Sequence, residues 1–415
     1  MTKQRRAVIT GVGVCSALGQ SREELYMALR EGRSGIRFMP EWESFFGTSR
    51  MTAAPVSLDT ATIRKIDRHL RRTMGNASLF AALAAQSAVA ESGLDSATLA
   101  NGRCGCAVSS TVGSSSSIIE STEAFMQARQ LELSACQFFK CMSHTSSFNV
   151  ANLLGLRGVQ LSPCAACASS VQAIGTAMEQ IQLGRQDVMV AGGTDEVTHV
   201  VSASFQQVFA HAESETLPAE EMSRPFDAER LGLVCGEGAG IFVVEELEHA
   251  RRRGANILAE ILGYATNCSG WHVSKSDSGQ IRRCMELALL DAGLSPSEID
   301  VISTHGTATR NGDAAEAQAI AALFGSTTPA NSLKGSLGHT LGASGTLEAA
   351  VFLESMKRSE ILPTRNLTRI ADECAGVDWV MGAPRPAPLR TFLKNSIALG
   401  GVNSTMIIGA FQEPH

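Results

Sequence analysis

Short runs of β-branched and apolar residues alternate with stretches of helical spacing along most of the chain. The apolar runs predict strands at Ala7–Val14, Cys106–Ser109, Val159–Ser162, Val188–Ala191, Ala239–Val244, Val301–Thr304 and Thr405–Ala410. Helical spacing covers Glu23–Glu31, Asn76–Ser92 and Ala168–Leu183. Short buried strands that alternate with helices are typical of the α/β class, which is the fold class predicted here.

The composition is that of a globular protein. Of the 415 residues, 44% are hydrophobic and 18% are charged, so the chain can bury a large core and does not have the composition of a disordered protein. No stretch reaches the roughly 18 uninterrupted apolar residues that cross a bilayer. The basic start at residues 1–6 precedes an apolar run, as in a signal peptide, but Gly11 and Gly13 interrupt that run and residues 8–10 have strand character. We therefore expect a soluble protein with no membrane span.

The net charge and the cysteine content limit which classes of partner and which cellular compartment we expect. A net charge of −6 gives no general reason to bind nucleic acid. Eleven cysteines, an odd number in a chain of this length, do not suggest a disulfide framework, so we expect a reducing, cytoplasmic compartment. A local basic cluster is either a solvated helix face or a docking surface for an acidic protein; it consists of Arg64, Lys65, Arg68, Arg71 and Arg72.

The same coarse order of elements, here called a rhythm, occurs in two parts of the chain. A strand, a glycine-rich turn, a helix and then a reactive residue occur in each half, with a joint near Arg251–Gly254. This rhythm predicts an N-terminal half over residues 1–250 and a C-terminal half over residues 251–415.

The strand and glycines at residues 8–13 invite comparison with a dinucleotide-binding turn, where glycines let the backbone approach a pyrophosphate. The third glycine is misplaced, because Gly19 follows Gly13 by six residues. No acidic residue ends a strand about twenty positions further on. We therefore interpret these glycines as a tight structural turn between a strand and a helix.

The strongest candidate nucleophile is Cys167. It lies among small residues in the segment SPCAACASS, after a predicted strand and at the start of a predicted helix. Such a turn exposes the sulfur, and the helix N-terminus is expected to lower the thiol pKa. A zinc site would need two further ligands, and a redox pair with Cys164 would need a thioredoxin-like unit, so both are weaker interpretations.

Two histidines lie in glycine-rich loops of the second half. His305 follows the predicted strand Val301–Thr304, at the kind of strand end where open α/β sheets bind ligands. His339 lies in the segment KGSLGHTLGASG, before a helix. One cysteine and two histidines from separate loops suit covalent acyl transfer, with a sulfur nucleophile and imidazoles that donate hydrogen bonds or move protons.

Taken together and in order, these segments resemble the β-ketoacyl-acyl-carrier-protein synthases, condensing enzymes of the thiolase superfamily. The resemblance includes VITGVGVCSALG, RRTMGNASLFAALAA, the cysteine segment, SRPFDAERLGLVCGEGAG, HGTATRNGDAAE, KGSLGHTLGASG and NSIALGGVNST. It implies a thiolase-like fold of two duplicated α/β halves in five layers, αβαβα. It also implies an acyltransferase that joins malonyl-carrier protein to an acyl chain with loss of carbon dioxide.

The resemblance also implies roles for single residues. Cys167 would carry the acyl chain as a thioester, while His305 and His339 would promote decarboxylation and stabilise the enolate. The backbone N–H groups of Cys167 and Leu399 would form an oxyanion hole. The remaining expected site residues are Lys334, which would orient the site in a pair with Glu316; Asp313, which would shape the same loop; Thr307 and Thr309, on the phosphopantetheine arm; and Leu399 with Gly400, in the gate.

The expected partners follow from the same resemblance. Substrates would arrive on the phosphopantetheine of acyl-carrier protein, with no further cofactor and no metal. The basic residues Arg64, Lys65, Arg68 and Arg72 would complement that acidic carrier. The chain would form a homodimer, or a heterodimer with a related ketosynthase-like chain.

The resemblance implies fatty-acid biosynthesis or specialised polyketide or polyene biosynthesis. Two departures from the family pattern favour the specialised pathway, such as elongation of a polyene or another secondary metabolite. Leu399 stands where the family's gate usually has Phe, and Ser269 stands where it often has Asp. The alternatives left open are a subunit of a ketosynthase and chain-length-factor pair, a thiolase acting on acyl-coenzyme A, and a thiol oxidoreductase using Cys164 and Cys167. A late catalytic cysteine, typical of thiolases, is not evident, because Cys374 lies in a polar context without glycines.

Overall fold

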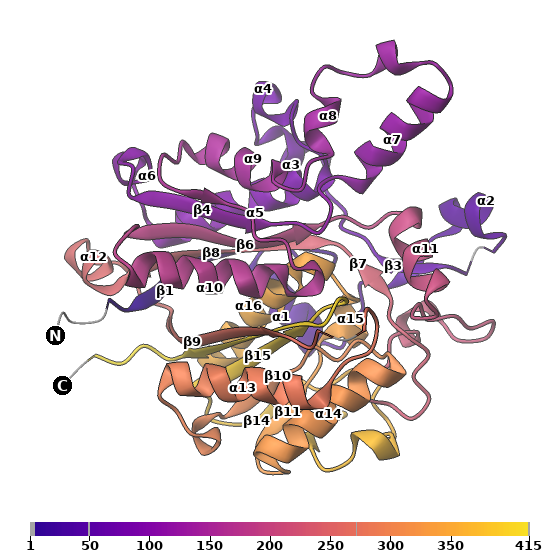
Figure 1. Cartoon of the computed structure of the whole chain (residues 1–415), viewed down its shortest axis with the longest axis vertical. Helices are drawn as coiled ribbons and strands as arrows, with labels where there is room; N and C mark the ends of the chain where they lie inside the picture. The colour runs from indigo at the N-terminus through magenta and orange to yellow at the C-terminus, as the bar shows by residue number, and fades with distance from the viewer. Residues whose placement is uncertain (1–4, 49, 271, 414–415) are drawn as a thin grey trace.

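The computed structural model describes residues 5–48, 50–270 and 272–413, and it stacks them in five layers (Figure 1). Helices form the two outer layers and the central layer, and strands form the two layers between them. The start of the chain before Arg5, which bears on the signal-peptide question, and Trp271 of the loop that holds Ser269 lie outside the described residues. The five layers agree with the predicted α/β arrangement.

Each strand layer has the same strand order. In the first half the order is β5–β4–β6–β8–β1, and in the second it is β11–β10–β15–β16–β9, with β13 added beyond β11. Numbering the five shared strands of each half by chain position gives the order 3-2-4-5-1 in both. The bounds are β1 Ala7–Ser16, β4 Cys104–Ser109, β5 Gln160–Leu161, β6 Val188–Asp195, β8 Gly238–Glu246, β9 Ala259–Cys268, β10 Val301–Ser303, β11 Pro329–Asn331, β13 Asp378–Trp379, β15 Thr391–Ile397 and β16 Val402–Gly409.

The two strand layers are joined at one edge. β1 pairs antiparallel with β9, with Ala7 opposite Ile261 and Ile9 opposite Ala259. Backbone hydrogen bonds therefore run without interruption from β5 to β13. The joint expected near Arg251–Gly254 lies in the last turn of α12 (Leu247–Arg252) and the residues that follow it.

Helices cover both faces of each strand layer. The central layer holds α10 (Ser169–Gln182) and α16 (Ser344–Arg358), whose apolar side chains share one buried cluster with residues from both sheets. α5 (Asn76–Ser92) and α9 (Thr145–Leu154) cover the first half outside, and α13 (Ser278–Ala292) and α14 (Arg310–Phe324) cover the second. Strands buried on both faces explain why their sequences read as continuous apolar runs.

Shorter elements connect these layers. The remaining helices are α1 Arg22–Arg30, α2 Glu43–Phe46, α3 Thr60–Arg64, α4 Arg68–Arg71, α6 Ser96–Ala100, α7 Ser115–Met126, α8 Gln137–Lys140, α11 His199–Gln207 and α15 Lys334–Leu337. Two small sheets are formed by β2 (Arg37–Phe38), β3 (Thr52–Ala54) and β7 (Cys235–Gly236), and by β12 (Glu360–Ile361) and β14 (Arg385–Pro386). Among the residues described, no helix combines the length and apolar character needed to span a membrane.

The interpretation of Gly11 and Gly13 as a turn is wrong. Both lie inside the ten-residue strand β1, and α5 crosses that strand at very short range. A Cβ atom on Gly13 would lie 1.8 Å from the carbonyl oxygen of Ala84, and one on Gly11 would lie 2.0 Å from that of Ala88. The glycines therefore let a helix backbone approach a strand, and the alanine-rich α5 allows the same approach from the other side.

Candidate active site

Cys167 lies where a strand is followed by a helix. It is the middle residue of a 3₁₀ turn, Ala166–Ala168, that leads directly into α10. Ala166 has a positive φ of 46°, an uncommon conformation for a residue with a side chain. The Ser169 hydroxyl holds the turn, because it accepts from the Ala165 N–H at 2.9 Å and donates to the Ala166 carbonyl at 2.6 Å. The sulfur is thereby fixed at the start of the central helix.

The second half builds the same turn at the start of α16. Leu341 has a φ of 51°, and the 3₁₀ turn Leu341–Ala343 leads into Ser344. Gly342 takes the position that Cys167 has in the first copy. Its N–H donates to Asp195 Oδ2 at 2.7 Å, and Asp195 ends strand β6 of the first half. At the position where the first copy carries a thiol, the second copy therefore has a glycine whose N–H binds the first half.

His339 lies directly beside the thiol. Its Nε2 is 3.0 Å from Cys167 Sγ, and its Nδ1 is 3.0 Å from Ser344 Oγ. The backbone of His339 is held by the first half, because its N–H donates to the Val234 carbonyl and its carbonyl accepts from Gly236. The ring is therefore fixed at both nitrogens and at its backbone.

His305 completes the cluster from the other side. It follows β10, and its ring centroid is 5.1 Å from that of His339, nearly perpendicular to it. Its Nδ1 is buried without a hydrogen-bond partner among the described residues. A buried nitrogen without a partner, on a residue that lines a cavity, is typical of a group that binds substrate. One side-chain nitrogen of each histidine and Cys167 Sγ lie within 4.8 Å of one another, a spacing that could also hold a soft metal ion.

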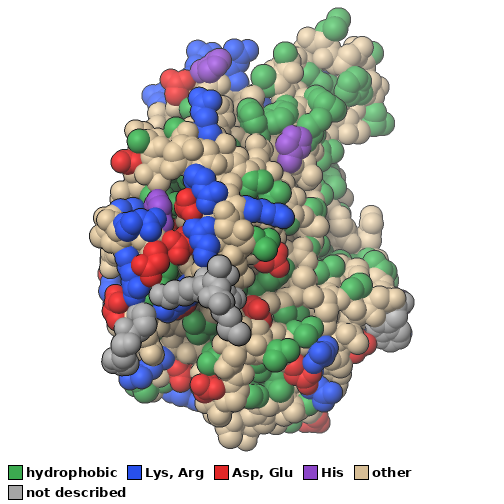
Figure 2. Space-filling model, turned by 60° about the vertical axis from the view of Figure 1, so that its left-hand side comes forward, with side chains coloured by type: hydrophobic (Ala, Val, Ile, Leu, Met, Phe, Trp, Pro, Cys, Tyr) green, Lys and Arg blue, Asp and Glu red, His purple; other side chains and the backbone are tan. Residues whose placement is uncertain are grey.

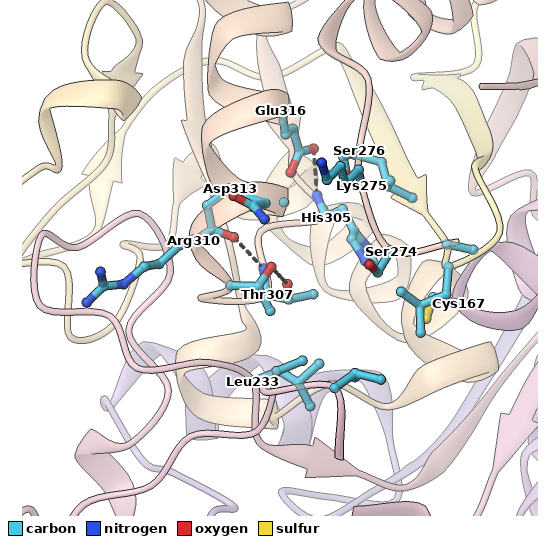
Figure 3. A pocket seen from close by; sticks show the side chains of 18 of the residues that line it. Cys167, Leu233, Ser274, Lys275, Ser276, His305, Thr307, Arg310, Asp313 and Glu316 are labelled. Atoms are coloured by element: carbon cyan, nitrogen blue, oxygen red, sulfur yellow. Dashed lines mark hydrogen bonds between the residues drawn. The ribbon is translucent and has the colours of Figure 1, made fainter. Parts of the chain in front are cut away.

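Two buried carboxylates shape the His305 loop (Figure 3). Glu316 accepts from the N–H groups of His305 and Gly306, both at 2.8 Å. Asp313 accepts from Thr307 at 2.9 Å and from Ala308 at 3.1 Å. Both carboxylates come from the first two turns of α14, so this helix presents its acidic side chains to the loop before it. Asp313 therefore contacts the loop that the sequence analysis expects it to shape.

Lys334 does not pair with Glu316. Its Nζ lies 2.5 Å from Glu348 Oε1, on α16, because Lys334 begins α15 beside that helix while Glu316 is occupied by the loop backbone. A second buried lysine, Lys394 of β15, lies 2.6 Å from the other oxygen of Glu348. Neither Glu348 nor Lys394 was singled out from the sequence.

Burial decides the protonation of the three central side chains. It raises the pKa of the Cys167 thiol to about 12, although Lys334 and the N–H groups of Cys167 and Leu399 act in the opposite direction. The expectation of a lowered thiol pKa is therefore wrong, because desolvation outweighs the helix N-terminus. Burial, with Lys334 next, also holds the pKa values of His305 and His339 well below their usual range. The resting site holds a thiol and two neutral imidazoles.

A cavity of about 440 Å³ leads to these side chains. Figure 3 shows Cys167 at one end and Arg310 at the other, with Thr307 between them. The Thr307 and Thr309 hydroxyls lie 3.0 Å apart in its wall. Leu399 also lines the cavity and is 44% exposed, whereas Gly400 does not line it. Gly400 instead has a φ of 86° and donates to the Val273 carbonyl, so it sets the turn beside Leu399.

The basic cluster lies away from the cavity lining, on α3, α4 and the residues that end them. Arg64, Lys65, Arg68 and Arg72 are exposed, whereas Arg71 is half-buried and donates to the Ile66 carbonyl. Figure 2 shows a group of basic side chains near the top of the molecule, at the height that α4 has in Figure 1. All eleven cysteines are free, including Cys164, which is exposed.

Comparisons with known proteins agree on one family. The model of the β-ketoacyl synthase N-terminal domain matches residues 4–250, and that of the C-terminal domain matches residues 258–368. The 3-oxoacyl-[acyl-carrier-protein] synthase 1 of Haemophilus influenzae is 35% identical, covering 97% of this chain and 98% of its own.

Two solved structures are similar over nearly the whole chain. A β-ketoacyl synthase from Burkholderia phymatum has a TM-score of 0.93 at 38% identity and covers 98% of this chain and 100% of its own. The ishigamide ketosynthase/chain length factor has a TM-score of 0.91 at 32% identity and covers 99% of this chain and 100% of its own.

Proposed function

Because the chain belongs to the β-ketoacyl synthase family, we propose that it joins a Cys167-bound acyl chain to a malonyl unit with loss of carbon dioxide. Both substrates would be carried on the phosphopantetheine of acyl-carrier protein, and no further cofactor is needed. The observation that carries the proposal is the contact between Cys167 Sγ and His339 Nε2 at 3.0 Å, with His305 across the same cavity.

In the first step Cys167 takes the acyl group. His339 Nε2 accepts the thiol proton while the sulfur attacks the thioester carbonyl, and the proton then goes to the departing carrier thiol. A thiol of raised pKa needs this transfer during attack, because little thiolate exists beforehand. The N–H groups of Cys167 and Leu399, which both act on the sulfur, would donate to the oxyanion.

In the second step a malonyl thioester loses its carboxylate as carbon dioxide. The electron pair of the broken C–C bond moves into an enolate, whose oxygen accepts hydrogen bonds from His305 and His339. Neutral imidazoles suit this role, since each keeps one N–H donor. The enolate carbon then attacks the Cys167 thioester, the sulfur leaves as a thiolate, and it takes up one proton from solvent to restore the thiol.

Ser344 supports both steps. Its hydroxyl contacts His339 Nδ1 at 3.0 Å and Thr340 Oγ1 at 3.1 Å. Because a hydroxyl can accept or donate, it can pair with either neutral tautomer of His339. Nε2 can therefore accept a proton in the first step and donate a hydrogen bond in the second.

Substrate delivery is assigned to the two threonines and the basic cluster. Thr307 and Thr309 would hold the phosphopantetheine arm along the cavity, with Leu399 and Gly400 as its gate. Arg64, Lys65, Arg68 and Arg72 would attract the acidic carrier to the surface. We assign the catalytic steps to Cys167, His305 and His339, with Lys334, Asp313 and Glu316 in support, and the halves to residues 1–250 and 251–415.

We further propose a cytoplasmic enzyme of specialised metabolism that works as a dimer. The leucine at the gate motivates the specialised role, because an aliphatic side chain leaves a wider entrance than an aromatic ring. The likeness to the ishigamide ketosynthase/chain length factor supports a second arrangement, in which this chain is the active subunit of a heterodimer.

The test is intact-protein mass after mixing the enzyme with a panel of acyl-carrier-protein thioesters. One acyl adduct on the wild type, absent from Cys167→Ala, would support the proposed nucleophile. Preference for unsaturated or aryl-capped chains would support the specialised pathway, and preference for saturated chains would contradict it. If no thioester gives an adduct, even with a related ketosynthase-like chain present, the proposed function is wrong.

A further inference from the structure

Two buried lysines share a single glutamate beneath the histidines. Lys334, Lys394 and Glu348 are each no more than 1% exposed. Lys334 occupies one oxygen of Glu348 and Lys394 occupies the other, at 2.5 and 2.6 Å. One lysine would already neutralise Glu348, and burying a second cation costs free energy. The second lysine therefore calls for a role beyond neutralising this carboxylate.

The hydrogen bonds of Lys394 connect it to the start of the His305 loop. Its Nζ donates to the Thr304 carbonyl at 3.0 Å and to its own neighbour, the Asn395 carbonyl, at 2.7 Å. Thr304 is the residue immediately before His305. The ammonium thus links Glu348, on the central helix α16, to the peptide unit that leads into one of the two histidines.

The strand pairing explains how the lysine reaches this position. Lys394 pairs with Ser303 at the end of β10, in parallel register. Phe392 faces the central buried cluster and Leu393 faces the outer one, so Lys394 faces the central layer again. Its neighbour Asn395 contacts Glu316 from the same strand, with Nδ2 at 3.2 Å from Oε1. Two consecutive residues of β15 therefore hold the His305 loop at two points.

We propose that Lys394 is a positioning residue for decarboxylation, which fixes His305 through the hydrogen bond that its ammonium donates to the Thr304 carbonyl. The inference rests on the proposed condensation reaction. It separates the two steps, because Lys394 contacts the His305 side of the site, whereas the thiol transfers its proton to His339.

The proposed role has a pH dependence. The charged and titratable groups around Lys394 are Glu348 on α16, Lys334 on α15, Glu316 on α14, and the two histidines. Burial, opposed by Glu348, lowers the pKa of Lys394 to about 8. The ammonium is present below that pH and is lost above it, so the decarboxylation rate of the wild type should fall as the pH rises through about 8.

The test measures the two steps separately on Lys394→Met, which keeps an unbranched side chain one atom shorter than lysine and removes the charge. Acylation is followed as the acyl adduct on Cys167, and decarboxylation as carbon dioxide released from malonyl-carrier protein by the acylated enzyme. We expect decarboxylation to fall about 100-fold, in line with the effect of small misplacements, while acylation changes less than about threefold. The alkaline fall near pH 8 should disappear.

Two further variants keep the result interpretable. Lys357→Met removes an exposed lysine from α16 and should leave both rates unchanged. Lys394→Ala leaves room for a small amine, and added methylammonium should restore part of the decarboxylation rate. An equal fall in both steps, a wild-type decarboxylation rate in Lys394→Met, or no restoration by methylammonium would overturn the inference. A wild type that forms no adduct and releases no carbon dioxide would instead contradict the proposed function.

Discussion

The sulfur of Cys167 lies 3.0 Å from Nε2 of His339, although the two residues are 172 positions apart and belong to different halves of the chain. Burial raises the pKa of this thiol and lowers that of the imidazole. Both shifts favour the uncharged pair at rest. In the proposed mechanism, charge would therefore separate only at the moment of attack.

The first prediction concerns alkylation of Cys167. Because burial raises the pKa of its thiol to about 12, the rate of reaction with iodoacetamide should climb with pH and show no plateau below pH 10. His339→Ala removes the proton acceptor and should lower the acylation rate by roughly 10²–10⁴-fold. Peptide mass spectrometry in a Cys164→Ser background separates Cys167 from its exposed neighbour. A plateau near pH 7 would show that the thiol is already ionised at rest.

The second prediction concerns stability in acid. The folded-state pKa values of His305 and His339 lie well below 6.5, so the unfolded chain binds more protons once the pH falls below that value. Each histidine should therefore cost about 1.4 kcal/mol of unfolding free energy per pH unit in that range. Urea titrations at pH 7.0 and 5.5 measure the loss. The double variant His305→Asn, His339→Asn should lose less, and an equal loss would contradict neutral burial.

The third prediction concerns the shared glutamate. Glu348→Gln leaves two buried ammonium groups without their common carboxylate, and removing one partner of a buried ion pair typically costs about 3–5 kcal/mol. Glu132→Gln, in an exposed pair with Arg129, should change stability by less than about 1 kcal/mol. Denaturant titration of both variants gives the comparison. Equal stabilities would mean that water already reaches the lysines.

The fourth prediction concerns carrier docking. Arg68→Glu reverses one charge in the exposed basic cluster and should raise KM for carrier-bound substrate by about tenfold, most strongly at low salt. The rate with a short pantetheine thioester should not change, because the cluster lies outside the cavity lining. Arg283→Glu, on α13 at the opposite end of the molecule, is the control (Figure 1). If both variants behave alike, carrier protein docks elsewhere.

The fifth prediction concerns the gate. Leu399→Phe adds an aromatic ring at the exposed cavity wall and should slow acylation by bulky chains about tenfold relative to acetyl groups. Val200→Phe, exposed on α11 and outside the lining, should leave that ratio unchanged. The ratio is measured by competition between two carrier thioesters. An unchanged acceptance profile in Leu399→Phe would remove the physical reason for a specialised pathway.

The sequence predicts the layers better than it predicts the charged interior. α5 has the bounds that its spacing predicts, Asn76–Ser92, because a buried alanine-rich helix between glycines is a strong local pattern. The strands β9 and β15 were not predicted. In β15, polar residues such as Lys394 and Asn395 interrupt the apolar character. These residues are buried only because α16 and α14 supply their partners. No local pattern carries that information.

The same reason explains the two errors at the site. A pairing of Lys334 with Glu316 is reasonable from the loop that each flanks, but the partner on α16 is visible only once the central helices are packed. A lowered thiol pKa follows from the helix N-terminus considered alone. The desolvation that outweighs it depends on every layer around the sulfur. Local sequence patterns predict which residues are reactive, whereas the protonation of these residues depends on the assembled fold.

The turn that holds Cys167 has a structural twin at Leu341–Ala343, and the twin's Gly342 donates to Asp195 across the seam between the halves. A separated N-terminal half would keep its sulfur but lose the imidazole beside it and the donor to Asp195. A separated C-terminal half would keep both imidazoles but would lack the thiol that takes the acyl group. Duplication has here produced two incomplete copies, and neither half can regain the reaction by itself through a single substitution.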